Sequence, residues 1–172
     1  MRQVLVRGDR LMLSVDPGGT TGWLLFRPSA EIQPWGGYGI EPIAWGEERD
    51  QQAFCDMVWK MSTARLKSER IDGIVCERWT PRDGVRTWEP EPVEITGFCR
   101  WKMGNDPTRF FLQGVSEAKA FGTDTKVHPY VRSWDPPFNI GRGGEGHARI
   151  ALMHALLWTN VRWMPNAEER AA

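Results

Sequence analysis

The sequence predicts an α/β domain built around one mixed β-sheet. Three short apolar stretches separated by tight turns come first, which is typical of an antiparallel meander. Further along the chain, the apolar spacing takes on a helical period, and strand-like stretches alternate with helical ones. Strands joined through helices run parallel, so the meander should form one edge of the sheet with the parallel strands beside it. A chain of 172 residues suits one core, so we treat residues 1–172 as a single domain.

The meander is expected to consist of strands over residues 10–15, 23–28 and 43–48. The first, "RLMLSV", is mostly apolar rather than alternating, as in a strand that is buried on both faces. The turn "DPGGTTG" leads into "WLLFRP", and Pro28 is predicted to end this second strand because proline has no N–H group to donate. The third strand, "IAWGEE", follows a segment that contains several glycines and prolines.

A helix lying on the sheet is predicted within residues 47–70, followed by a fourth strand over residues 71–79. The apolar residues of the helix recur at i, i+3, i+4 and i+7, namely Phe54, Met57, Val58 and Met61. The fourth strand, "IDGIVCERW", is apolar until Glu77. Because a helix crossover joins the first strand to the fourth, the two could lie side by side.

The second half of the chain alternates between helix and strand. It should contain a helix over 93–103 ended by Gly104, a strand over 109–115, and a short helix over 117–121 capped by Ser116 and closed by Gly122. A loop with few periodic features is expected to run from there to residue 146. The last helix, 147–161, is apolar on most sides and should be well buried.

Composition limits the classes of partner and the compartment. The formal net charge is zero, so a nucleic acid or an anionic membrane would have to be held by a local patch. Three widely spaced cysteines fit a reducing compartment better than a disulfide framework or a zinc site. We find neither a signal-peptide pattern nor an apolar run of membrane-spanning length, so we expect a cytoplasmic protein. Residues 1–9 are expected to be an N-terminal extension, and residues 165–172 a disordered tail.

The carboxylates of Asp16 and Glu77 are the main candidates for chemistry. If the first and fourth strands are neighbours, their ends bring these two side chains together. Like charges repel unless a cation lies between them, and Mg²⁺ prefers oxygen ligands while keeping waters that a phosphate can replace. Two such ions about 4 Å apart can activate water and stabilise the leaving oxygen of a phosphodiester. The alternatives are an Asx-turn at Asp16 and, for Glu77, a charge that marks the end of a strand.

Four stretches together resemble the RuvC-type Holliday-junction resolvases, especially the compact versions found in bacteriophages. They are "SVDPGGTTGW", "IVCERW", "QGVSEAKAF" and "GHARIALMHALLW", and they occur in the order that the family has. The resemblance implies an RNase H-like fold with a five-stranded mixed sheet flanked by helices. It also implies a homodimer that resolves four-way junctions or other branched DNA by paired phosphodiester hydrolysis, with Mg²⁺ as cofactor or Mn²⁺ in its place.

The resemblance also assigns roles to particular residues. Asp16 and Glu77 correspond to the acids that bind the catalytic metal. Lys119, after the fifth strand, corresponds to a lysine near the scissile phosphate. Lys126 is the nearest match to a second family lysine, which we expect to contact DNA.

The last helix departs from the family pattern. The family presents an acid or a histidine near the helix start and an aspartate three residues later. Here His147 occupies the first position, as a metal ligand or as a general base, but Ile150 occupies the second and can do neither. Glu145 is the candidate for the missing oxygen ligand, although acids also favour the first turn of a helix because of its dipole. His154 is interpreted as a hydrogen-bonded core histidine.

The loop after Glu77 is the predicted DNA-binding segment. It interleaves arginines, which neutralise phosphates, with tryptophans, which stack on exposed bases. Its residues are Arg78, Trp79, Arg82, Arg86 and Trp88. The resemblance implies that an aromatic residue in this region wedges at the strand crossover, a role that falls to Trp79 or Trp88. Packing at a dimer surface is the alternative for these two tryptophans.

Three other functions remain open. "DPGGTTG" also resembles the phosphate loop of actin-like and sugar-kinase ATPases, but the chain has length for only one such domain and shows no second phosphate loop. Ile150 leaves room for a non-catalytic protein that binds branched DNA. A nuclease of the same fold that acts on flaps, forks or RNA–DNA hybrids is the third, and fold alone does not separate these functions.

Overall fold

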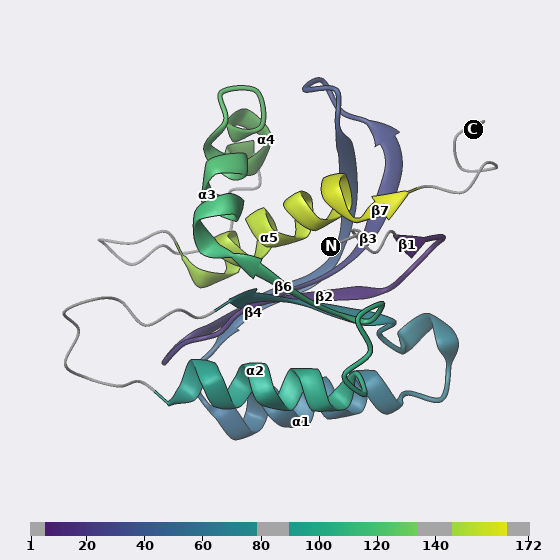
Figure 1. Ribbon diagram of the computed structural model, residues 1–172, viewed down its shortest axis with the longest axis vertical. Helices are drawn as coiled ribbons and strands as arrows, with labels where there is room; N and C mark the ends of the chain where they lie inside the picture. Colours follow the sequence, from purple (N-terminus) through teal and green to yellow (C-terminus); the bar gives the residue numbers. More distant parts are fainter. Residues whose placement is uncertain (1–5, 79–89, 134–145, 165–172) are drawn as a thin grey trace.

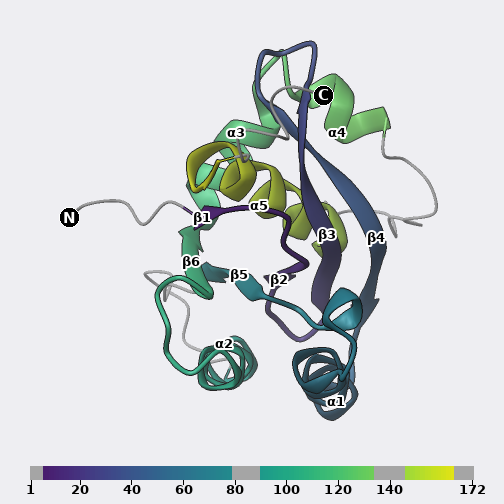
Figure 2. The ribbon, with the colours of Figure 1, turned by 90° about the vertical axis from the view of Figure 1, so that its right-hand side faces the viewer.

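A central β-sheet separates two layers of helices in the computed structural model, which describes residues 6–78, 90–133 and 146–164. Helices α1 (Gln51–Thr63) and α2 (Glu91–Lys102) cover one face. Helix α5 (His147–Val161) crosses the other face, with α3 (Val115–Thr123) and α4 (His128–Ser133) beside it (Figures 1 and 2). This arrangement of layers is the one that the alternating pattern of strands and helices predicted.

The five strands of the main sheet lie in the order β4-β3-β2-β5-β6. They are β2 (Met12–Asp16), β3 (Thr21–Ile32), β4 (Tyr38–Glu48), β5 (Gly73–Arg78) and β6 (Phe110–Gly114). Strand β3 pairs antiparallel with β2 and with β4, whereas β2–β5 and β5–β6 are parallel pairs. The predicted meander, the parallel strands beside it and the contact between the first and fourth predicted strands are all confirmed.

The prediction that Pro28 ends the second strand is wrong. Strand β3 continues to Ile32, and Pro28 pairs with Ile40 between two irregularities of the register. The reason is that β2 pairs with β3 only as far as Phe26, so beyond that point one edge of β3 has no neighbouring strand among the described residues. A residue without an N–H group costs no ladder hydrogen bond there.

The other corrections concern the ends of elements. Strand β4 begins at Tyr38, earlier than predicted. Helix α1 ends at Thr63, and only a short 3₁₀ turn, η1 (Lys67–Glu69), follows it within the segment predicted to be helical. Asp50 fixes the start of α1 by accepting hydrogen bonds from the backbone N–H groups of Gln52 and Ala53.

The region after β6 is more helical than the sequence indicated. Helix α3 starts directly after Gly114, so Ser116 lies inside it and is not its cap. Gly122 does not close the helix either. A Cβ atom there would lie 2.5 Å from Met153 Cγ, so glycine lets α3 approach α5 closely. Residues 128–133, predicted to be part of a loop, form the short helix α4.

Alternation along the strands divides the core into two clusters. Met12 of β2 and Val75 of β5 pack with α5, whereas Leu13 of β2 and Ile74 of β5 pack toward α1 and α2. Because successive side chains of a strand point to opposite faces, Asp16 and Glu77 fall on the α5 side of the sheet. Both faces of the central strands are therefore covered, as their continuous apolar runs predicted.

A two-stranded parallel sheet joins the ends of the described chain. Strand β1 (Val6–Arg7), within the predicted N-terminal extension, pairs with β7 (Trp163–Met164) directly after α5. The indole N–H of Trp163 also donates to the carbonyl of Gly8 at 3.0 Å. The predicted tail, residues 165–172, lies outside the described residues. Among the helices that the structure describes, none combines the length and the apolar character that a membrane crossing requires.

Candidate active site

Three polar side chains lie level with one another on neighbouring strands of the central sheet. Val15 pairs with Cys76 across β2 and β5, so Asp16 is level with Glu77 one residue further on. Glu77 pairs in turn with Gln113 of β6. All three share the face that α5 covers, since each is an even number of positions from a residue of its own strand in the α5-side cluster. The parallel register therefore brings together the two acids that the sequence singled out.

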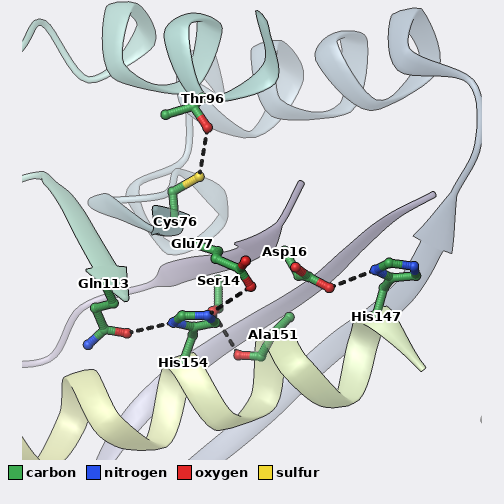
Figure 3. A network of polar contacts seen from close by, with 9 residues as sticks. All are labelled: Ser14, Asp16, Cys76, Glu77, Thr96, Gln113, His147, Ala151 and His154. Atoms are coloured by element: carbon green, nitrogen blue, oxygen red, sulfur yellow. Dashed lines mark hydrogen bonds and ion pairs between the residues drawn. The ribbon is translucent and has the colours of Figure 1, made fainter. Parts of the chain in front are cut away.

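Helix α5 lies across this row with its first two turns. His147, Ala151 and His154 are spaced i, i+4 and i+7, so they lie on one face of the helix. Ser14 of β2 anchors that face because its buried hydroxyl donates to the carbonyl of Ala151 at 2.7 Å. Figure 3 shows the consequence, with both histidines projecting from α5 toward the strand ends that carry Asp16 and Glu77.

The closest polar contact of the site joins Asp16 to His147. Nδ1 of His147 lies 2.7 Å from Oδ2 of Asp16. The carboxyl is nearly buried, with 8% of its side chain exposed, whereas the imidazole is 45% exposed. Among the described residues, the side chain of Asp16 therefore interacts with groups that lie far from it in the sequence. This is more than the Asx-turn that was the simplest interpretation of "DPGG".

The pKa values of the two acids move in opposite directions. The pKa of Asp16 is raised to about 6; burial is the largest cause, the hydrogen bond with His147 opposes it, and the neighbouring Glu77 carboxyl adds to the increase. Burial also acts to raise the pKa of Glu77, but hydrogen bonds with His154 and Asp16 and the charge of Lys119 outweigh it and lower that pKa. Of the two carboxyls, Asp16 is therefore the one that takes up a proton first as the pH falls.

Asp16 also sets the charge of His147. The hydrogen bond to the Asp16 carboxylate raises the pKa of His147 above its ordinary value of 6.5, against the effect of partial burial. The charges of Glu47 and Glu77 add to this increase. When Nδ1–H donates to Asp16, the second ring nitrogen, Nε2, is left as the position that can accept a proton.

The start of α5 is held against the sheet by Gly22 and Glu47. A Cβ atom on Gly22 would overlap the backbone of His147 and Ala148, so only glycine permits this close approach. The carboxylate of Glu47 accepts a hydrogen bond from the N–H of Ala148 at 3.4 Å, at a helix end whose N-cap residue, Gly146, offers no side-chain cap. These two residues position His147, and the sequence interpretation assigned no function to either.

His154 lies two turns deeper on the same helix face. Its side chain is fully buried, with Nδ1 3.1 Å from the Gln113 amide and Nε2 3.4 Å from Oε2 of Glu77. The interpretation as a hydrogen-bonded core histidine is confirmed, but the contact with Glu77 was not foreseen. The seven-residue spacing from His147 was the signal in the sequence that could have indicated it.

The other predicted residues that the structure describes are three exposed cations and one core residue. Lys119 is exposed on α3, and its charge is felt by Glu77. Arg78 is exposed at the end of β5, directly after Glu77. Lys126 is exposed between α3 and α4, where its backbone N–H donates to Asp124 at 2.9 Å. Ile150 is 5% exposed and belongs to the core.

Five predicted residues fall outside the part of the chain that the structure describes. They are Glu145, the candidate for an additional oxygen ligand, and four residues of the predicted DNA-binding loop, namely Trp79, Arg82, Arg86 and Trp88. Their assignments stay predictions.

The donor set fits a hard divalent cation that is held by few protein ligands. The carboxyls of Asp16 and Glu77 lie close together, and the pKa of one of them is raised. A positive charge between them would stabilise the ionised form of both. In the described part of the chain, no three side chains of His, Cys, Asp or Glu gather as a ligand set. Cys76, next to Glu77, points to the opposite face of the sheet toward Thr96, and burial raises the pKa of its thiol to about 12 (Figure 3). Mg²⁺ suits such a pair because water and phosphate oxygens commonly complete its coordination.

Comparison with solved structures identifies the fold. The structure of RuvC from Thermus thermophilus has a TM-score of 0.56 and 13% identity, covering 86% of this chain and 92% of that chain. RuvC of the same organism in complex with a Holliday junction substrate has a TM-score of 0.53 and 11% identity, covering 86% and 91%. This chain has a RuvC-like, RNase H-like fold. The yeast mitochondrial Holliday junction resolvase Ydc2 has a TM-score of 0.43 and 12% identity, covering 92% and 80%.

The similarity to these proteins is one of fold. A scan against protein-family models gives no match, and neither does a search of curated proteins. The fold expected from the four sequence stretches is nevertheless confirmed, including the mixed sheet and the final helix across it. In this RuvC-like chain, the acids of β2 and β5 lie level under the start of α5.

Proposed function

We propose that this protein is a divalent-metal-dependent endonuclease that cuts branched DNA, with four-way junctions among its substrates. The observation that carries the proposal is the convergence of Asp16 and Glu77 on one face of a RuvC-like sheet, with His147 2.7 Å from Asp16. The likeness to RuvC, of which one similar structure contains a Holliday junction substrate, supports branched DNA as the substrate class.

In this proposal Asp16 and Glu77 hold the cation, with Mg²⁺ as the natural ion and Mn²⁺ as a substitute. When bound, the ion would supply Lewis-acid activation of water and would stabilise charge on the phosphate. With a cation between them, the carboxyls of Asp16 and Glu77 would no longer repel each other, and both would be ionised at neutral pH. Glu145 remains the candidate for a further oxygen ligand.

His147 acts as the general base in the same proposal. Its Nδ1–H donates to Asp16, which orients the ring and leaves Nε2 to take a proton from the attacking water. The imidazole is exposed enough to meet a substrate, with 45% of its side chain accessible. Lys119 provides a positive charge on the Glu77 side of the centre, which suits a contact with the scissile phosphate.

The predicted DNA-binding segment is the stretch that follows Glu77 in the sequence. Arg78 begins this segment at the exposed end of the strand. Arg82 and Arg86 would neutralise phosphates, Trp79 or Trp88 would stack at the crossover, and Lys126 would contact the DNA backbone. Because a four-way junction has near two-fold symmetry, we propose that a homodimer presents two sites to it.

A second candidate function is the binding of branched DNA without cleavage. The specific observation that favours it is Ile150, which packs into the core at the helix position where the resemblance implied an aspartate ligand. A weakened metal site would then leave a protein that recognises junctions but does not hydrolyse them.

The deciding experiment is a nicking assay on a labelled four-way junction with Mg²⁺ or Mn²⁺, run beside a linear duplex of the same sequence. We expect paired nicks in the junction arms, and we expect Asp16→Asn and Glu77→Gln to abolish nicking while junction binding is retained. Glu94→Gln is the matched control, because this exposed carboxylate lies on α2 on the opposite face of the sheet.

Each outcome separates the candidates. Junction binding without nicks in either ion would favour the non-cutting protein. Equal nicking of linear and branched DNA would remove the selectivity from the proposal. Nicking that survives both Asp16→Asn and Glu77→Gln would contradict the assignment of the site.

A further inference from the structure

We propose that His154, oriented by Gln113, is a positioning residue that holds the Glu77 carboxylate in the orientation in which it receives the cation. The inference rests on the proposed function because it concerns the same metal site. It assigns a task to a buried histidine that touches neither solvent nor substrate. In Figure 3, the imidazole of His154 lies between Gln113 and Glu77, and its contacts are made from opposite sides of the ring.

The first step is the burial of His154. No part of its side chain is accessible to solvent, whereas Glu77 keeps 17% of its side chain exposed. An imidazole in this environment needs a partner at each nitrogen, because unsatisfied buried polar groups are costly. Nδ1 finds Gln113 at 3.1 Å, and Nε2 finds Oε2 of Glu77 at 3.4 Å.

The second step is the direction of these hydrogen bonds. When the two ends of the Gln113 amide drawn in Figure 3 are exchanged, the amide satisfies all of its neighbours. Its nitrogen then donates to Nδ1 of His154 at 3.1 Å and to the His154 carbonyl at 3.0 Å, and its oxygen accepts from the backbone N–H of Trp158 at 3.2 Å. Nδ1 is therefore the acceptor, so the ring proton is on Nε2 and is donated to Glu77.

The third step is what this donor does to Glu77. A single N–H group fixed in the core engages one carboxylate oxygen and leaves the other for a cation. Gln113 binds both Nδ1 of the ring and the backbone carbonyl of His154, and these two contacts fix the orientation of the ring. Groups that donate to a metal ligand in this way orient the ligand, and their loss commonly lowers metal affinity about 10- to 100-fold.

The fourth step is the neighbourhood on α5. Ile150 contributes no oxygen to the site, since it is buried in the apolar core. One turn further along the helix, His154 reaches the Glu77 carboxylate directly. Among the described side chains of α5, His154 is hydrogen-bonded to Glu77 and His147 to Asp16. Each acid of the pair thus has its own histidine.

Three substitutions of His154 test the idea atom by atom. His154→Gln keeps an N–H donor near the position of Nε2, His154→Asn keeps a polar group only near the position of Nδ1, and His154→Leu keeps neither. We expect about a 10-fold or greater loss of Mn²⁺ affinity in the Asn and Leu variants and affinity closer to wild type in the Gln variant. Titration calorimetry of the DNA-free protein with Mn²⁺ alone measures this.

Thr159→Val is the matched control for damage to the fold. Thr159 is also buried on α5, and its hydroxyl donates to the carbonyl of Ala155 at 2.9 Å, away from the carboxylates. We expect its Mn²⁺ affinity to equal that of wild type. Because a leucine at position 154 could prevent folding, a further measurement uses the unmutated protein: nitrogen NMR of the imidazole should show the Nε2-protonated tautomer.

The outcomes separate this inference from the proposed function. If the three His154 variants bind Mn²⁺ as wild type does, or if Nδ1 carries the proton, the positioning role is wrong, whether or not the protein cuts DNA. If wild type binds Mn²⁺ in a His154-dependent way but cuts no branched DNA, the proposed function fails and the positioning role stands. If the DNA-free wild type does not bind Mn²⁺ at all, the positioning role is wrong, and the nicking assay alone decides the proposed function.

Discussion

Replacing Asp16 with asparagine should make the metal-free protein more stable at neutral pH, although it removes a proposed metal ligand. Burial and the nearby Glu77 raise the pKa of Asp16 from 3.8 to about 6. The folded state therefore binds a proton more tightly than the unfolded state does, and the folded protein loses stability as the pH rises from about 4 to about 6. The asparagine side chain does not titrate, so the Asp16→Asn variant avoids this loss.

The size of the effect follows from the change in pKa. A rise of the Asp16 pKa from 3.8 to about 6 means that, above pH 6, the free energy of unfolding of wild type is lower by at most about 3 kcal/mol than it is with Asp16 protonated. His147 acts in the same direction. The raised pKa of His147 stabilises the folded wild type fully below pH 6.5, the ordinary pKa of histidine. This stabilisation is lost as the pH rises through the higher pKa of His147 in the folded state. The advantage of Asp16→Asn should therefore grow steadily with pH.

Urea unfolding in EDTA, at several pH values between about 4 and about 8, measures this difference. We expect Asp16→Asn to be close to wild type at the acid end and more stable at the neutral end, with Glu94→Gln showing no such trend. Saturating Mn²⁺ should stabilise wild type and leave the Asp16→Asn variant almost unchanged, since ligands stabilise only the state that binds them. A difference that does not vary with pH would refute the assigned burial and repulsion at Asp16.

Three further predictions concern the groups around this pair. Gly22→Ala should destabilise the protein by about 1–3 kcal/mol and slow cleavage strongly, because the new methyl group overlaps the backbone at the start of α5. Urea unfolding and the nicking rate measure the two effects. Gly19→Ala is the control for both, because a Cβ atom at Gly19 meets nothing within 4 Å. Asp16→Asn should lower the pKa of His147 toward its ordinary value, because the carboxylate that stabilises the imidazolium is gone. Proton NMR titration of the metal-free protein measures this pKa, with the His128 signal as an internal reference. An unchanged pKa would contradict the 2.7 Å contact between Asp16 and His147. Lys119→Met should raise the pKa of Glu77, measured by carboxyl NMR, and slow junction cleavage, measured by single-turnover nicking. The control is Lys60→Met, at another exposed lysine. An equal loss of cleavage rate in this control would argue against a local role for Lys119.

The pairing of β2 with β5 could be predicted because the sequence carries its main determinants locally. "RLMLSV" and "IVCERW" are apolar on both faces, which places their strands in the middle of a covered sheet. A helical segment between them makes a parallel crossover, and from that the meeting of Asp16 and Glu77 follows. Both acids stand at strand ends, so their position in the sequence already defined the edge where they meet.

The features that the sequence did not reveal depend on contacts between distant segments. Pro28 is tolerated in β3 because β2 does not reach far enough to pair with it, which is a property of the neighbouring strand. Gly122 and Gly22 each allow a helix to approach, but the partners lie far away in the chain. His154 shows the same limit, since its periodicity predicted burial while its contact with Glu77 depends on the register of β5 and β6.

The arrangement of the site follows from two periodicities that meet at one place. Alternation along parallel strands brings Asp16, Glu77 and Gln113 to the same face at the same level. Helical spacing on α5 aligns His147 and His154 above them, one over each acid. An aspartate at position 150 would give the helix a ligand of its own, but here that position serves the core. Among the described residues, the helix then acts on the acids through its two histidines, so the geometry of both carboxylates depends on how firmly α5 is held against the sheet by Ser14, Gly22 and Glu47.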